Sequence, residues 1–255
     1  MGKGNLFSDE CSPRSDFGQS RHEVPEERLS TIALAMLELA ADEAVRSELP
    51  DIGNSDESLL SIMERGDAPA LEGAIVDLYI SLHALGSKYS AAERKVLDIR
   101  SGYSCYPGGL LPLIMAGPHI RRESIVVDLG AGNGLQGLFL QRLYPHRKTL
   151  QVELSGEMIR IGRVFQQALG IPDNRITWIN DDILNVSIDS ADFIYIYRPA
   201  RPQGKGSEIY RAIARKLTEG HRPRVVFSVA DCLGEFLDGF SVFYTDGHLT
   251  CFRKD

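Results

Sequence analysis

The chain has 255 residues, of which 43% are hydrophobic and 25% are charged, values ordinary for a soluble globular protein. This length accommodates one large α/β domain, or one domain with a helical extension, and either would bury an ample core. The net charge of −7 argues against a protein that coats nucleic acid nonspecifically, but it does not exclude a nucleic-acid substrate held by a local basic patch. The four cysteines are scattered, which favours reduced thiols over a disulfide framework or a zinc site.

The first 24 residues mix glycine, serine, proline and charged residues without periodicity, which predicts a flexible tail over 1–24. This polar start lacks the features of a secretory signal. The most lipophilic short stretch, Leu110–Ala116, contains Pro112 and is too short to span a bilayer. We therefore expect a cytoplasmic protein that does not cross a membrane.

Residues 25–118 predict a helical region, because apolar residues recur there at three- and four-residue steps. Ser90 and Glu93 form a capping-box pattern, which predicts the start of a helix after Ser90. No strand is predicted before residue 119. The predicted helices cover about 25–46, 56–64, the segment from Leu71 to Leu85, 90–100 and a short apolar segment before Gly117, with a loop at 101–109.

Residues 119–255 alternate between predicted strands and helices, a pattern typical of a parallel sheet covered by helices on both faces. At the end of the chain, Asp246-Gly247 separates two apolar segments and is typical of a hairpin turn. The fold class is therefore α/β, with an antiparallel hairpin closing one edge of the sheet. Strands are predicted at 125–129, 148–153, 175–179, 192–197, 223–229, 239–245 and 248–253, and helices near 134–144, 155–170 and 205–217.

A glycine-rich loop follows the first predicted strand. Residues 124–134 read Ser-Ile-Val-Val-Asp-Leu-Gly-Ala-Gly-Asn-Gly. A dinucleotide-binding fingerprint would need glycine at position 135, where this chain has leucine. Glycines let the backbone approach a ligand closely, although they also serve simply to allow a tight turn from strand to helix.

The spacing of Gly130, Gly132 and Gly134, with Asp128 just upstream, resembles class I S-adenosylmethionine-dependent methyltransferases. The resemblance extends from about Ile120 to the C-terminus and includes the terminal hairpin. It implies a Rossmann-like, mostly parallel seven-stranded sheet, S-adenosylmethionine as cofactor and S-adenosylhomocysteine as product. The loop residues that it assigns to cofactor binding are Asp128, Gly130, Ala131, Gly132, Asn133 and Gly134.

Three further acids lie at the ends of the next two predicted strands. Glu153 follows the glycine loop at close to the roughly 20-residue separation that is expected of an acid binding ribose hydroxyls. Leu154 is the next residue. A carboxylate accepts two hydrogen bonds and a ribose diol donates two, although Glu153 would also serve as a solvated helix cap. The resemblance places Asp182 and Ile183 at the adenine ring. Asp181 and Asp182 would alternatively be turn-forming aspartates.

The fourth predicted strand ends in Tyr197-Arg198-Pro199. Methyltransferases acting on base amines or on glutamine often show Asn/Asp-Pro-Pro-Tyr/Phe here, so this departure puts such chemistry in doubt. If the methyl acceptor is a hydroxyl or a protonated amine, a proton must also leave, and Tyr197 or a nearby acid is the candidate catalytic proton acceptor. Arg198 and Arg201 are candidate substrate-binding residues, because a guanidinium binds carboxylate or phosphate in a fork. Tyr106 is a third candidate, because the resemblance implies that the loop containing it folds over the cofactor and that its tyrosines shape the acceptor pocket. The arginines would alternatively be solvated or paired with Glu208, and no catalytic metal is expected.

The leading hypothesis is a methyltransferase whose helical region covers the site and selects an unidentified acceptor, with a small molecule favoured. One alternative is a catalytically silent cofactor-binding module that acts through a protein partner. Another is a methyltransferase that acts on protein or RNA, since basic residues outnumber acids between Arg198 and Arg224. An NAD-dependent oxidoreductase fits poorly because of Leu135 and the hairpin. The oligomeric state is left unassigned.

Overall fold

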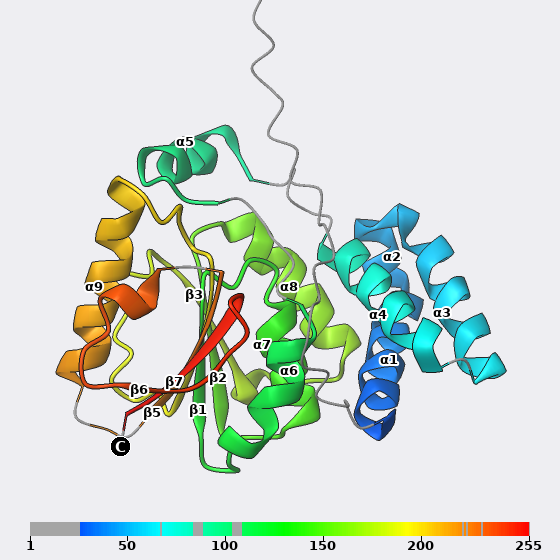
Figure 1. The fold of residues 1–255 in the computed structure, drawn as a ribbon. Helices are drawn as coiled ribbons and strands as arrows, with labels where there is room; N and C mark the ends of the chain where they lie inside the picture. Colours follow the sequence, from blue (N-terminus) through cyan, green and yellow to red (C-terminus); the bar gives the residue numbers. More distant parts are fainter. Residues whose placement is uncertain are drawn as a thin grey trace, which may run out of the picture.

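The computed structural model describes residues 26–66, 68–83, 89–103, 109–220, 222, 224–230 and 232–254 (Figure 1). The predicted tail at 1–24, Cys105 and the candidate Tyr106 lie outside the described residues. Among the described residues, no helix combines the length and the apolar character that a bilayer span requires.

The predicted helical region is confirmed, with one helix divided in two. The Asp42 side chain accepts hydrogen bonds from the backbone N–H groups of Ala44 and Val45, so it caps a new helix and ends the first. The capping box of Ser90 and Glu93 is present as predicted. The helices are α1 (Glu26–Ala41), α2 (Glu43–Glu48), α3 (Gly53–Arg65), α4 (Ala68–His83), α5 (Ala91–Ile99) and α6 (Leu111–Ala116).

Seven strands form one sheet in the order β3-β2-β1-β4-β5-β7-β6. The first five strands pair in parallel, whereas β7 is antiparallel to both β5 and β6. This is the predicted Rossmann-like sheet with a C-terminal antiparallel hairpin. The strands are β1 (Ile125–Leu129), β2 (Lys148–Glu153), β3 (Ile176–Asn180), β4 (Phe193–Tyr197), β5 (Arg224–Val229), β6 (Ser241–Thr245) and β7 (Leu249–Lys254).

Helices cover both faces of the sheet (Figure 1). On one face lie α7 (Leu135–Leu143) and α8 (Gly156–Ala168), and on the other lies α9 (Lys205–Glu219). Side chains alternate along β1, so Val126 packs towards α7 and Val127 towards α9.

The helical region packs directly on α7 and α8, because one apolar core extends from α1 and α4 through these helices to the sheet. At its edge, the Arg160 guanidinium of α8 forms a bidentate ion pair with Glu48 of α2, with N···O distances of 2.8 and 2.7 Å. The boundary between two domains after residue 118 remains a prediction. The apolar core contains residues from both sides of this boundary.

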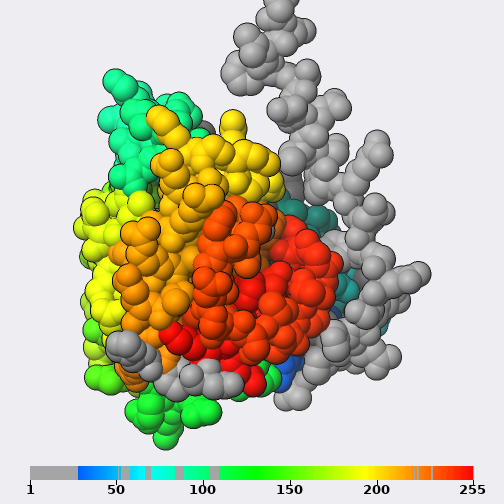
Figure 2. Space-filling view, turned by 60° about the vertical axis from the view of Figure 1, so that its left-hand side comes forward, coloured from blue at the N-terminus to red at the C-terminus, as the bar shows by residue number. Residues whose placement is uncertain are grey.

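The segment 89–103, which contains α5, lies apart from the other helices at the carboxyl ends of the strands. Gly102 forms an antiparallel bridge with Ala200, just after β4. Figure 2 shows α5 at the top of the molecule, beside the segment after β4 that is drawn in yellow. This segment therefore covers the edge of the sheet where open α/β folds bind ligands.

The glycine loop after β1 is held by close packing against α8. A Cβ atom added to Gly162 would overlap the Trp178 ring and lie 2.7 Å from the carbonyl oxygen of Asn133. We expect Gly162→Ala to lower the free energy of unfolding by about 1–3 kcal/mol, because overpacking forces the loop or the ring to move.

The matched control is Gly73→Ala in α4, where an added Cβ meets no atom within 4 Å. Because alanine favours helix more than glycine does, this variant is expected to be up to about 1 kcal/mol more stable. Urea unfolding of both variants measures the difference. Equal stability of Gly162→Ala and the wild type would contradict the packing described.

Candidate binding site at the strand ends

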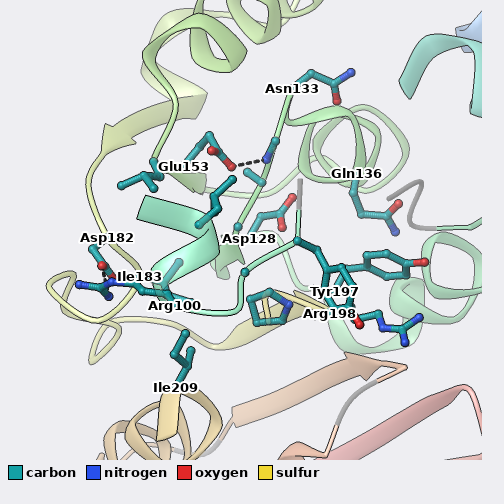
Figure 3. A pocket seen from close by; sticks show the side chains of 18 of the residues that line it. Arg100, Asp128, Asn133, Gln136, Glu153, Asp182, Ile183, Tyr197, Arg198 and Ile209 are labelled. Carbon is teal, nitrogen blue, oxygen red and sulfur yellow. Dashed lines mark hydrogen bonds and ion pairs between the residues drawn. The ribbon is translucent and has the colours of Figure 1, made fainter. Parts of the chain in front are cut away.

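A pocket opens at the carboxyl ends of the central strands, and we call it the strand-end pocket (Figure 3). It lies where the chain order reverses, because β2 and β4 flank β1 on opposite sides. Ligands bind at such switch points in open α/β sheets. Its walls come from the glycine loop, the ends of β2 and β3, the tip of β4 and the segment 89–103.

The glycines of the loop have two different tasks. Gly130 and Gly132 have φ angles of 80° and 58° and line the pocket, where a Cβ would approach only one neighbouring atom each, at 3.9 and 3.8 Å. Gly134 also has a positive φ, but a Cβ there would overlap the Trp178 ring. The backbone groups of Gly130, Ala131 and Gly132 are thus accessible to a ligand in the pocket. Gly134 lies outside the pocket lining, and its missing side chain allows the loop to pack against the sheet.

Glu153 is buried beneath the glycine loop and is only 4% exposed. Its carboxylate accepts a hydrogen bond of 2.8 Å from the backbone N–H of Gly132 (Figure 3) and another of 2.8 Å from that of Ser155. The hydroxyl of Tyr89 donates to the same carboxylate at 3.4 Å. Burial raises the pKa of Glu153, although these donors favour its charged form. A carboxylate has lone pairs beyond those used here, so it can accept from a ligand as well.

Asp128 is the most deeply buried acid of the pocket, at 2% exposure. Its Oδ2 atom has no hydrogen-bond partner among the described residues. Burial raises the pKa of Asp128 to about 7, against a hydrogen bond from the Gly137 N–H, and the charge of Glu153 raises it further. A buried carboxyl oxygen without a partner is rare in folded proteins and points to a ligand that donates to it.

Asp182 lies at the opposite end of the pocket, with Ile183 beside it (Figure 3). Its carboxylate pairs with the Arg100 guanidinium at the end of α5 and accepts a 2.9 Å hydrogen bond from the Leu184 N–H. Asp181 accepts from the Asp182 N–H and from the Asn185 side chain, which are contacts of a turn. Asp182 therefore combines a turn contact with a charged contact to the covering segment.

The tip of β4 forms the remaining wall. Tyr197 and Arg198 line the pocket, and Arg198 has a φ angle of 38°, a left-handed conformation that is unfavourable for a residue with a side chain. Its guanidinium lies 4.9 Å from the centre of the Tyr103 ring. Arg201 lies 5.9 Å from that ring and is exposed outside the pocket lining. Glu208 has no ion pair with either arginine among the described contacts.

The helical region contributes residues that the sequence patterns did not single out for this site. Tyr89 contacts Glu153, Arg100 contacts Asp182, and His83 lines the pocket as well. Burial lowers the pKa of His83 to about 4, so its ring is neutral at physiological pH. These side chains carry no local motif, since each reaches the pocket only through long-range packing.

No cluster of three histidine, cysteine, aspartate or glutamate side chains with the geometry of a metal site occurs in the part of the chain that the structure describes. Asp192, the acid nearest to the β4 tip in sequence, lies at the other end of that strand. It accepts from the Ile125 N–H at 2.8 Å and pairs with Arg222.

The buried Asp128 makes stability depend on pH in a defined direction. Its pKa rises from 3.8 to about 7 on folding, so the unfolded chain releases this proton at lower pH than the folded chain. The contribution of Asp128 to the free energy of unfolding is therefore fully favourable below pH 3.8 and is lost as the pH rises towards about 7. Relative to the wild type, Asp128→Asn is expected to become more stable across this interval. Urea unfolding at a series of pH values measures this, and a stability difference independent of pH would contradict the burial of an ionisable Asp128.

No protein-family model matches the sequence, and the comparison with curated proteins found no match either. Solved structures do resemble part of the chain. An RNA methyltransferase from Salinibacter ruber, solved with S-adenosyl-L-homocysteine, is 17% identical with a TM-score of 0.45 and covers 57% of this chain and 88% of its own.

Two SAM-dependent methyltransferases solved with the same compound are also similar to parts of this chain. The protein from Geobacter sulfurreducens is 20% identical (TM-score 0.38, 47% of each chain), and that from Thiobacillus denitrificans is 16% identical (TM-score 0.41, 55% of each chain). The assignment of the fold rests on the strand order itself, which is the Rossmann-like seven-stranded sheet expected for class I methyltransferases.

Proposed function

We propose that this protein is an S-adenosylmethionine-dependent methyltransferase, with S-adenosylhomocysteine as product. One observation carries the proposal. Three features that the resemblance assigns to one cofactor line a single pocket and come from three neighbouring strands. They are the glycine loop, Glu153 and Asp182.

The residues of the pocket fit such a cofactor. Glu153 would accept from the ribose hydroxyls, and Asp182 with the Ile183 N–H would contact adenine. The absence of Cβ atoms at Gly130 and Gly132 leaves the loop backbone accessible, which supports close approach of the ligand. Tyr89 contacts Glu153, and Arg100 contacts Asp182. Each of these two side chains would either share its acid with the ligand or move away from it.

The bound sulfonium supplies an electrophilic methyl group, and the protein has to orient the acceptor and exclude water. Such alignment accounts for roughly 7–11 kcal/mol of a barrier, so no strong base is needed. The segment 89–103 covers the strand ends and would exclude water from this part of the pocket.

The tip of β4 would hold the acceptor. Tyr103, Tyr195 and Tyr197 line this end of the pocket, and we propose that it holds a small acceptor. Arg198 would bind a carboxylate or phosphate of that acceptor. Where the acceptor loses a proton on methylation, the Tyr197 oxygen would accept it while the hydroxyl proton of Tyr197 passes to water, so that the residue acts as a relay.

Replacing Glu153 tests cofactor binding. We expect Glu153→Gln to bind S-adenosylhomocysteine about tenfold more weakly or worse, because hydrogen bonds to a charged acceptor are lost. Titration calorimetry measures the affinity. Glu157→Gln is the matched control, since Glu157 follows four residues later and pairs with Arg160 outside the pocket. The proposal fails if the wild type gives no heat with this ligand, or if both variants bind like the wild type.

Replacing Tyr197 tests the acceptor end. With labelled S-adenosylmethionine and fractionated cell extract, label is expected in a small-molecule fraction rather than in RNA or protein. With that fraction, Tyr197→Phe is expected to lower turnover by about 10² or more while the affinity for S-adenosylhomocysteine stays unchanged. Full turnover of the variant would remove Tyr197 from the mechanism. Strong cofactor binding without any incorporation of label would favour a catalytically silent module.

A further inference from the structure

An arginine of the covering segment already pairs with one of the acids that the proposed function assigns to the cofactor. Oδ1 of Asp182 accepts a 2.9 Å hydrogen bond from the backbone N–H of Leu184, whereas Oδ2 pairs with Nη1 of Arg100. Both members of this ion pair line the strand-end pocket and lie against each other (Figure 3). A ligand that donates a hydrogen bond to Oδ2 therefore meets a guanidinium there.

The same segment contacts Glu153 in a different way. The hydroxyl of Tyr89 donates to Oε1 of Glu153 at 3.4 Å, which is a long contact made by a neutral donor. A ligand hydroxyl can share Glu153 with such a donor, because a carboxylate accepts several hydrogen bonds. At Asp182 the competing donor is charged, and charged donors form the stronger hydrogen bonds. Arg100 is therefore the contact of this segment that competes with a ligand.

Arg100 can leave Asp182 without displacement of the segment that carries it. Gly102 forms a backbone bridge to the chain after β4, and the Glu93 carboxylate accepts a 3.2 Å hydrogen bond from the N–H of Gly156. These contacts hold the segment on both sides of Arg100. The Arg100 side chain is 42% exposed, whereas that of Asp182 is 12% exposed. A change of side-chain rotamer thus brings the guanidinium into water while Asp182 stays in the pocket.

We propose that Arg100 is an internal competitor for Asp182, which the amino group of the cofactor's adenine displaces on binding. This inference rests on the proposed function, because it requires adenine at Asp182. The affinity of the pocket is then reduced according to the fraction of molecules in which the ion pair is formed. Because a half-exposed ion pair is weak, we expect this reduction to be about two- to fivefold. The contact is thus autoinhibitory for cofactor binding.

The test compares two ligands that differ only in the group facing Asp182. One is S-adenosylhomocysteine, and the other is its 6-deamino analogue, in which hydrogen replaces the amino group of adenine. By titration calorimetry, Arg100→Met is expected to bind S-adenosylhomocysteine about two- to fivefold more tightly than the wild type and to leave the affinity for the analogue unchanged. Arg94→Met is the matched control, because Arg94 is an exposed cation of the same helix outside the pocket lining. It should leave both affinities unchanged.

Ionic strength provides a second readout of the same ion pair. S-adenosylhomocysteine is a zwitterion without net charge at neutral pH, so the comparison of wild type and variant isolates the effect of salt on the protein. Raising the ionic strength from about 0.01 M to about 1 M shortens the screening length from roughly 30 Å to roughly 3 Å. We expect this change to strengthen binding to the wild type about twofold, because it weakens the ion pair, and to leave Arg100→Met without such a gain.

Arg100→Lys separates charge from size. It keeps the cation beside Asp182, so its affinity for S-adenosylhomocysteine is expected to stay close to that of the wild type. Unchanged or weaker binding of S-adenosylhomocysteine by Arg100→Met would overturn the inference. An equal gain for the 6-deamino analogue, or an equal gain in Arg100→Lys, would overturn it as well. A wild type that binds neither ligand would instead refute the proposed function itself. Thermal unfolding of each variant verifies that it is folded.

Discussion

The buried carboxylate of Glu153 joins three parts of the molecule at one point. It accepts from the glycine loop at Gly132, from the start of α8 at Ser155 and from Tyr89 of the covering segment. Removing a carboxylate from water is costly, and the cost is offset here by backbone donors that have a fixed position. The end of β2 therefore determines where the loop after β1 lies. The shape of the pocket depends on this constraint.

Close packing then holds the loop from the other side. Gly162 of α8 and Gly134 both lie against the Trp178 ring, where no side-chain carbon would fit. The loop is thus fixed between a charged acceptor and a packed aromatic ring, and its backbone remains exposed to the pocket at Gly130 and Gly132. A ligand that binds there meets a preorganised surface, which lowers the entropy lost on binding.

Much of the fold could be predicted from the sequence because the signals are local. Alternation of apolar segments predicted the strands to within one or two residues, and Asp246-Gly247 predicted the hairpin. The division of the first helix at Asp42 was missed, although an aspartate before a helical turn is a recognisable cap. That the glycine loop, Glu153 and Asp182 lie at one edge could be predicted, because each stands at the carboxyl end of a predicted parallel strand.

The rest of the site could not be predicted, because it depends on contacts between distant segments. The hydroxyl of Tyr79 in α4, for example, donates to Gln136, a pocket residue that lies 57 positions later in the chain. Tyr89 and Arg100 likewise reach the pocket only because residues 89–103 pair with the chain after β4. The role of Gly134 was also ambiguous, since a glycine that packs and a glycine that contacts a ligand look identical in a sequence.

The central claim is that the ends of β1, β2 and β3 form one adenosyl-binding pocket. A crystal structure of the full chain with S-adenosylhomocysteine at saturating concentration tests it most directly. The account predicts the ribose hydroxyls within hydrogen-bond distance of Glu153 and adenine beside Asp182. A ligand bound elsewhere, or an empty pocket under these conditions, would contradict it.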